Sequence, residues 1–160
     1  MPELLENGWL PPGIHSAGWE PLRARFATNP HRRNMLRRML EFLHWANANG
    51  TFSNVYLGGG FISRKPRPGD LDLVLETVAP YGPEALNAMA PLMRQGNPRI
   101  FEQYGVHLHF WAEGFPAGIH DFRRFFQYVS PREAGDHHDL QGAVKGIVKL
   151  SLRDHPMPQP

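Results

Sequence analysis

The residues best suited to chemistry are two aspartates, Asp70 and Asp72, that stand two positions apart in an otherwise apolar segment. Side chains alternate along a strand, so both carboxylates should point to one face of a sheet, with Leu71 and Leu73 on the other. Two like charges this close repel each other unless a cation or a shared proton compensates them. Such a pair of oxygen ligands is typical of a site for a hard divalent ion such as Mg2+.

Each aspartate also has an explanation without a metal ion. Asp70 follows Pro68 and Gly69, and an aspartate in such a turn often bonds only to nearby backbone. Asp72 lies inside the predicted strand between two leucines, where a carboxylate without a partner is unfavourable. The position of Asp72 therefore favours contact of the pair with a metal ion or a phosphate.

Three glycines, residues 58–60, follow the apolar segment 55–57 and precede the aspartates. Backbone that lacks a Cβ atom can approach a phosphate closely and turn its N–H groups toward it. Arg64 and Lys65, in the linker between the glycines and the aspartates, could place positive charge around a triphosphate. The alternative interpretation is a plain turn after a strand, with loop cations that have no partner.

Gly59 and Gly60, followed after nine residues by Asp70-Leu71-Asp72, resemble the signature of the nucleotidyltransferase superfamily related to DNA polymerase beta. Further motifs make the chain similar to a family of small, uncharacterised bacterial and phage nucleotidyltransferase-like proteins in that superfamily. These motifs are Leu10-Pro11-Pro12-Gly13-Ile14-His15, Asn29-Pro30-His31-Arg32-Arg33, Gly59-Gly60-Phe61, Pro68-Gly69-Asp70-Leu71-Asp72, Phe125-Phe126-Gln127 and Lys145-Gly146-Ile147-Val148.

The resemblance implies an α/β (α+β) fold with a small mixed β-sheet flanked by helices. It also implies a minimal nucleotidyltransferase, which would transfer a nucleoside monophosphate from a nucleoside triphosphate to a hydroxyl on protein, RNA or a small molecule. Asp70 and Asp72 would hold Mg2+ or Mn2+, and the phosphates would contact Gly59, Gly60, Arg64 and Lys65. Similar small proteins act as antitoxins, so the resemblance further implies a toxin–antitoxin or phage-defence setting with a toxin as protein partner.

In the superfamily a third carboxylate comes from a neighbouring strand, and by alignment with the family this position is His107. An imidazole is neutral and softer than a carboxylate, so the exchange removes a negative charge and shifts preference from Mg2+ toward Mn2+ or Zn2+. His107 is then a ligand or general base, or a polar residue in an inactive site, unless Glu76 or Glu113 supplies the third carboxylate. The inactive case would be a catalytically degenerate module that binds a protein partner or RNA.

The elements that must position these residues can be predicted from local patterns. Asn29 and Pro30 open a helix over residues 30–48. Alternation predicts a strand over residues 106–111, with His107, His109 and Trp111 on one side. A last strand is expected over residues 143–152, and the polar, turn-rich residues 130–139 indicate a mobile loop.

Four arginines occur on the predicted helix over residues 30–48: Arg32, Arg33, Arg37 and Arg38. They would form either a solvated helix face or a surface for RNA or a partner protein. The formal net charge of +2 is by itself too small to indicate nucleic-acid binding.

Length and composition set further limits. The 160 residues, 41% of them hydrophobic, suffice for one core, so we expect a single domain over residues 19–152. Residues 1–18 should be an irregular arm and residues 153–160 a disordered Pro-rich tail. The absence of cysteine excludes disulfides, cysteine-ligated zinc and thiol catalysis. Without an apolar run of ~20 residues or a signal-like N-terminus, we expect no membrane partner and a cytoplasmic location.

Overall fold

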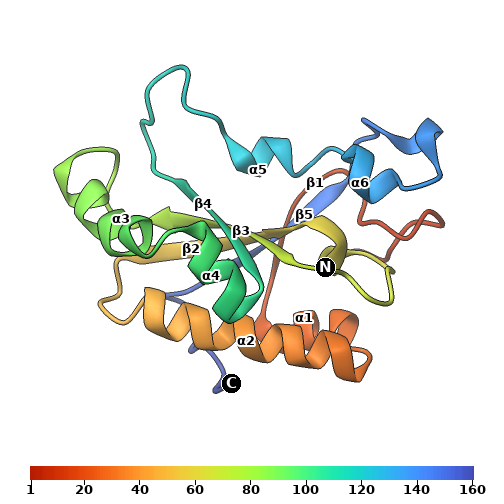
Figure 1. The fold of residues 1–160 in the computed structure, drawn as a ribbon, viewed down its shortest axis with the longest axis horizontal. Coiled ribbons are helices and arrows are strands. Elements are labelled where there is room, and N and C mark those ends of the chain that lie inside the picture. Colours follow the sequence, from red (N-terminus) through yellow and green to blue (C-terminus); the bar gives the residue numbers. More distant parts are fainter.

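The computed structural model describes residues 1–160, except for the side chain of His138. Five strands form one mixed sheet in the order β1-β5-β2-β3-β4. Helices α1 and α2 lie on one side of this sheet, and the short helices α5 and α6 lie on the other (Figure 1). The expected α/β (α+β) fold, a small mixed sheet flanked by helices, is confirmed.

Most connections between the elements are short, and the longest, residues 112–121, joins β4 to α5. The strands are β1 (Gly13–Ala17), β2 (Phe52–Gly58), β3 (Leu71–Thr77), β4 (Val106–Trp111) and β5 (Gly146–Ser151). The helices are α1 (Trp19–Phe26), α2 (Pro30–Ala46), α3 (Pro83–Gln95), α4 (Asn97–Tyr104), α5 (Phe122–Phe125) and α6 (Pro131–Ala134), with 3-10 turns η1 (Gly59–Ile62) and η2 (His138–Leu140). Strand β2 pairs antiparallel with β3 and β5, whereas the pairs β1–β5 and β3–β4 are parallel.

Helix α2 provides much of the core on its side of the sheet. The side chain of Asn29 caps it by accepting a hydrogen bond of 2.9 Å from the backbone N–H of Arg32, as the sequence predicts. Apolar residues of α2 share one buried cluster with Leu71, Leu73 and Leu75 of β3. Because these leucines point toward α2, the alternating Asp72 points to the opposite face of the sheet.

Arg32 is only 2% exposed, so it does not belong to a solvated or RNA-binding helix face. Its guanidinium donates hydrogen bonds to the carbonyl oxygens of Phe26, Phe61, Ser63 and Lys65. Burial lowers the pKa of Arg32 to about 10, which still leaves the group charged at neutral pH. Arg32 therefore fixes the segment that follows η1 against the start of α2.

The two ends of the chain are more ordered than the sequence indicates. The expectation of an irregular arm over residues 1–18 is wrong for β1, whose backbone pairs with β5 at the edge of the sheet. The tail, residues 153–160, contains no helix or strand, but it is packed: Met157 contacts the main core, and Pro158 O lies 2.9 Å from Nε2 of His44. Both segments are ordered by distant parts of the chain, which local sequence patterns do not reveal.

The role of Arg32 can be tested by unfolding in urea. Arg32→Ala leaves several buried carbonyl oxygens without a donor, so we expect it to lower the free energy of unfolding by about 3 to 5 kcal/mol. Arg33→Ala, on the exposed side of the same helix, should change this free energy by less than about 0.5 kcal/mol. Equal effects of the two substitutions would contradict a structural role for Arg32.

Candidate metal centre

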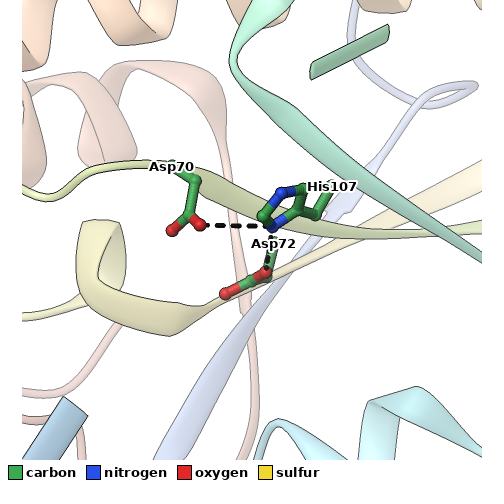
Figure 2. A group of neighbouring side chains, drawn as sticks. All are labelled: Asp70, Asp72 and His107. Carbon is green, nitrogen blue, oxygen red and sulfur yellow. Dashed lines mark ion pairs between the residues drawn. The ribbon is translucent and has the colours of Figure 1, made fainter. Parts of the chain in front are cut away.

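Asp70, Asp72 and His107 come together where β3 and β4 begin. The parallel register of these strands sets Asp72 beside His107, and Asp70 immediately precedes β3. Nδ1 of His107 lies 3.2 Å from Oδ2 of Asp70 and 3.6 Å from Oδ1 of Asp72 (Figure 2). One possible ligand atom from each residue lies within 4.8 Å of the others. The structure thus brings together the three residues that the sequence nominates for catalysis.

The two carboxylates are partly withdrawn from water, with side-chain exposures of 14% for Asp70 and 20% for Asp72. Burial, and then the charge of Asp70, raise the pKa of Asp72 to about 6, against the opposing effect of His107. When no cation compensates its charge, Asp72 is therefore largely protonated below about pH 6. A divalent ion would favour the ionised form of both aspartates.

The donor set of the cluster consists of two carboxylates and one imidazole. Oxygen ligands suit Mg2+ and Mn2+, whereas an imidazole nitrogen shifts the preference from Mg2+ toward Mn2+ or Zn2+. The ring of His107 stacks on Phe101, with 4.6 Å between ring centroids, which limits its rotation. The residues present therefore fit a divalent transition-metal ion such as Mn2+ better than they fit Mg2+.

His109, two residues along β4, does not join this cluster. Its ring stacks on Phe122 with 3.8 Å between centroids. Burial, helped by the nearby His107 and His120, lowers the pKa of His109 to about 4, so this ring is neutral at physiological pH. His109 therefore serves as an aromatic packing residue behind the cluster.

Gly59, in the turn after β2, allows the backbone to lie close to the carboxylate of Asp72. Its φ of +72° lies in the left-handed region, and a Cβ atom at this position would come within 2.2 Å of Oδ2 of Asp72. Any other residue would be strained and would also displace the carboxylate. The glycine turn and the metal-ligand candidates therefore form one structural unit.

A cavity of about 190 Å³ contains the cluster. Besides the three cluster residues it is lined by Gly60, Lys65, Gly69, Phe125, Phe126, Tyr128, Ser130, Arg132 and Glu133. Gly60 and Lys65, both nominated from the sequence as phosphate contacts, thus line the same cavity as the aspartates. Arg64 instead lines a neighbouring cavity with Gly8 and Trp9, and its backbone N–H donates to the carbonyl oxygen of Gly8 at 2.8 Å.

Glu76 and Glu113 lie away from the cluster. Glu76 lies four residues, or about 13 Å, along β3 from Asp72. Its carboxylate accepts hydrogen bonds from Asn54 at 2.8 Å and from the Tyr56 hydroxyl at 2.9 Å. His107 lies near the start of β4, whereas Glu113 lies in the turn that follows the end of this strand. Neither residue supplies a third carboxylate to this site.

Three charged residues of the site were not predicted from the sequence as site residues: Arg132, Glu133 and Lys145. Nη1 of Arg132 lies 3.2 Å from Oδ2 of Asp70. Lys145, 2% exposed, forms an ion pair with Glu133, and the charges of both reach Asp72. With Lys65, the site therefore combines three carboxylates, three cationic side chains and the imidazole of His107.

The missed residues differ in whether the sequence could have indicated them. Ser130 and Glu133 form a capping box, a pattern recognisable as Ser-x-x-Glu, so the expectation of a loop throughout residues 130–139 is wrong at α6. Lys145 belongs to a motif of the resemblance, Lys145-Gly146-Ile147-Val148, but its place in the site could not be predicted, because its burial results from the distant α6.

The fold and the site define a mixed α/β protein with an Asp-Asp-His cluster beside a glycine turn. The chain belongs to a family of unknown function, DUF6932, which matches residues 2–151. No curated protein and no solved structure matches the chain. None of the helices that the structure describes combines the length and apolarity needed to cross a bilayer.

The raised pKa of Asp72 predicts how stability depends on pH in the metal-free protein. The folded state binds more protons than the unfolded state between about pH 4 and pH 6, so stability should fall as the pH rises through this window. Asp72→Asn should therefore be more stable than the wild type by about 1 to 3 kcal/mol above pH 7, with the difference shrinking toward zero near pH 4. Urea unfolding across this pH range measures the difference, and a gain that grows on acidification would contradict the assignment.

The contact between Gly59 and Asp72 can be separated from simple backbone strain. Gly59→Ala should lower the free energy of unfolding by about 2 kcal/mol or more and weaken Mn2+ binding at least about tenfold, because both the backbone and the carboxylate must move. Gly50→Ala is the matched control, since Gly50 has a φ of +64° but open space around its Cβ position. It should cost about 1 kcal/mol and leave Mn2+ affinity, measured by calorimetry, unchanged. Equal Mn2+ affinities for the two variants would contradict the proposed contact.

Proposed function

We propose that the protein is a metal-dependent nucleotidyltransferase that transfers a nucleoside monophosphate from a nucleoside triphosphate to a hydroxyl on protein, RNA or a small molecule. The observation that supports this most is the convergence of Asp70, Asp72 and His107 beside the Gly59 turn. Ligands for a divalent ion next to backbone that can approach phosphate are what this reaction requires.

The residues of the cavity divide between a metal ion and phosphates. Asp70, Asp72 and His107 would hold Mn2+, or Mg2+ less well because of the nitrogen ligand. When bound, the ion would neutralise charge on the triphosphate and lower the pKa of the attacking hydroxyl. Lys65 and the backbone N–H group of Gly60, which both line the cavity, would bind phosphate oxygens, together with the backbone N–H group of the adjoining Gly59.

Arg132 is suited to move from a carboxylate to a phosphate. Its side chain is 75% exposed, so the ion pair with Asp70 is screened by water and contributes little to stability. The guanidinium can leave Asp70 when a cation takes its place and then bind a phosphate oxygen in the same cavity. Arg132 would thus make the phosphate contact that the sequence resemblance assigns to Arg64.

In the proposed reaction the acceptor oxygen attacks the α-phosphorus of the nucleoside triphosphate. The bond from this phosphorus to the oxygen that bridges to the β-phosphorus breaks, and pyrophosphate leaves with that oxygen. The proton of the acceptor hydroxyl passes to solvent, or to the imidazole of His107 if this ring is not a ligand. Substrate hydroxyl and triphosphate thereby yield the nucleotidylated product, pyrophosphate and one proton.

A cytoplasmic location belongs to the same proposal. A chain without cysteine does not depend on disulfides, and nucleoside triphosphates are available in the cytoplasm. A toxin as the protein acceptor, in a toxin–antitoxin or phage-defence setting, is the partner that agrees with the sequence resemblance.

The second candidate is a catalytically degenerate module that keeps the fold and binds a protein partner or RNA. It is favoured by one observation: Asp70 already has Arg132 and His107 as partners, so its charge is compensated without a metal ion. Such a module needs neither Mn2+ nor nucleotide.

Binding and transfer assays with α-labelled nucleoside triphosphates and Mn2+ distinguish the candidates. We expect the wild type to bind nucleotide only with the metal ion, and Asp72→Asn to weaken this binding about tenfold or more. Glu84→Gln, which changes an exposed carboxylate on α3, is the control and should bind as the wild type does. A wild type that binds neither Mn2+ nor any nucleotide would contradict the enzyme and support the module.

A further inference from the structure

Two exposed aromatic rings line the same cavity as the aspartates. The residues are Phe125 at the end of α5, 47% exposed, and Tyr128 shortly after it, 54% exposed. Asp70 and Asp72 in the same cavity are much less exposed. The cavity therefore leads from partly buried charged groups to half-exposed aromatic surface.

The ring of Phe125 and the backbone of Tyr128 are held in place by their surroundings. Phe125 makes edge-to-face contacts with His120, Phe122 and Phe126, at centroid distances of 5.4, 5.8 and 5.5 Å. The backbone N–H of Tyr128 donates to the carbonyl oxygen of Phe125 at 3.2 Å, and Tyr128 also forms an isolated bridge with Val144. A ring that is already ordered by packing, as that of Phe125 is, loses little conformational freedom when a ligand binds.

The size of the cavity limits what it can enclose. Its volume of about 190 Å³ is smaller than the roughly 300 to 1,000 Å³ of pockets that surround a whole small ligand. A nucleotide whose phosphates lie at the aspartates therefore extends beyond the enclosed volume, and the exposed aromatic wall offers its base a surface there. Every nucleobase offers a flat π face, and aromatic side chains stack on such faces with little regard to base identity.

We propose that Phe125 and Tyr128 form a stacking subsite for the base of the nucleotide whose phosphates lie at Asp70 and Asp72. This inference rests on the proposed function, which concerns only the phosphate end of the ligand. Because stacking does not read hydrogen-bonding edges, the subsite accepts purine and pyrimidine nucleotides alike, with purines bound more tightly through their larger rings.

Calorimetry with two ligands separates the base from the phosphates. Affinities are measured with Mn2+ for ATP and for inorganic tripolyphosphate, which has no base. Phe125→Leu and Tyr128→Leu should each weaken ATP binding about tenfold and leave tripolyphosphate binding within about twofold of the wild type. Tyr128→Phe retains the ring and should retain the affinity for ATP.

Tyr81→Leu is the matched control, because Tyr81 is 40% exposed and lines a different groove beside α3. It should change neither affinity. Phe125→Leu and Tyr128→Leu variants that bind ATP as the wild type does, or that weaken both ligands equally, would overturn the stacking subsite while the proposed function stands. A wild type that binds neither ligand would overturn the proposed function and the subsite together.

Discussion

The close approach of the Asp72 carboxylate to the backbone of Gly59 is the constraint on which the site depends. It requires a residue without a Cβ atom directly after β2, and it requires β2 and β3 to pair so that Gly58 lies opposite Asp72. On the other side of β3, the parallel register with β4 sets His107 beside the same aspartate. The buried guanidinium of Arg32 fixes the chain after the turn against α2. Backbone pairing on both sides of β3 and one buried cation thus determine where the acids meet.

The resulting arrangement is unfavourable in electrostatic terms. Two carboxylates are held near each other and away from water, and the raised pKa of Asp72 expresses the cost. Around them the chain places Lys65, Arg132 and the ion pair of the buried Lys145 with the partly buried Glu133, so that cations and carboxylates alternate around the cavity. Groups that destabilise one another in this way persist at functional sites, where a ligand supplies the missing compensation. The unfavourable feature is therefore local to the two adjacent aspartates, and it is the one that the proposed metal ion would relieve.

Much of this could be anticipated from the sequence, because the responsible patterns are local. Strand alternation indicates that Asp70 and Asp72 share a face, the Asn29 cap marks the start of α2, and the alternation over residues 106–111 presents His107 on an adjacent strand. What the sequence could not reveal depends on contacts between distant segments. The pairing of β1 with β5, the burial of Arg32 under the turn after η1, and the positions of Arg132 and Lys145 all arise only when the sheet has formed. Arg64 illustrates the same limit: its neighbour Lys65 lines both the cavity of the aspartates and the neighbouring cavity, whereas Arg64 lines the neighbouring one.

The most direct measurement of the central claim is anomalous diffraction from crystals grown with Mn2+ and a non-hydrolysable nucleoside triphosphate. The account predicts a manganese peak bonded to carboxylate oxygens of Asp70 and Asp72 and to Nδ1 of His107, with the triphosphate against the Gly59 turn and Arg132 turned away from Asp70. A cavity that contains neither manganese nor phosphate under these conditions, with Arg132 still on Asp70, would contradict it.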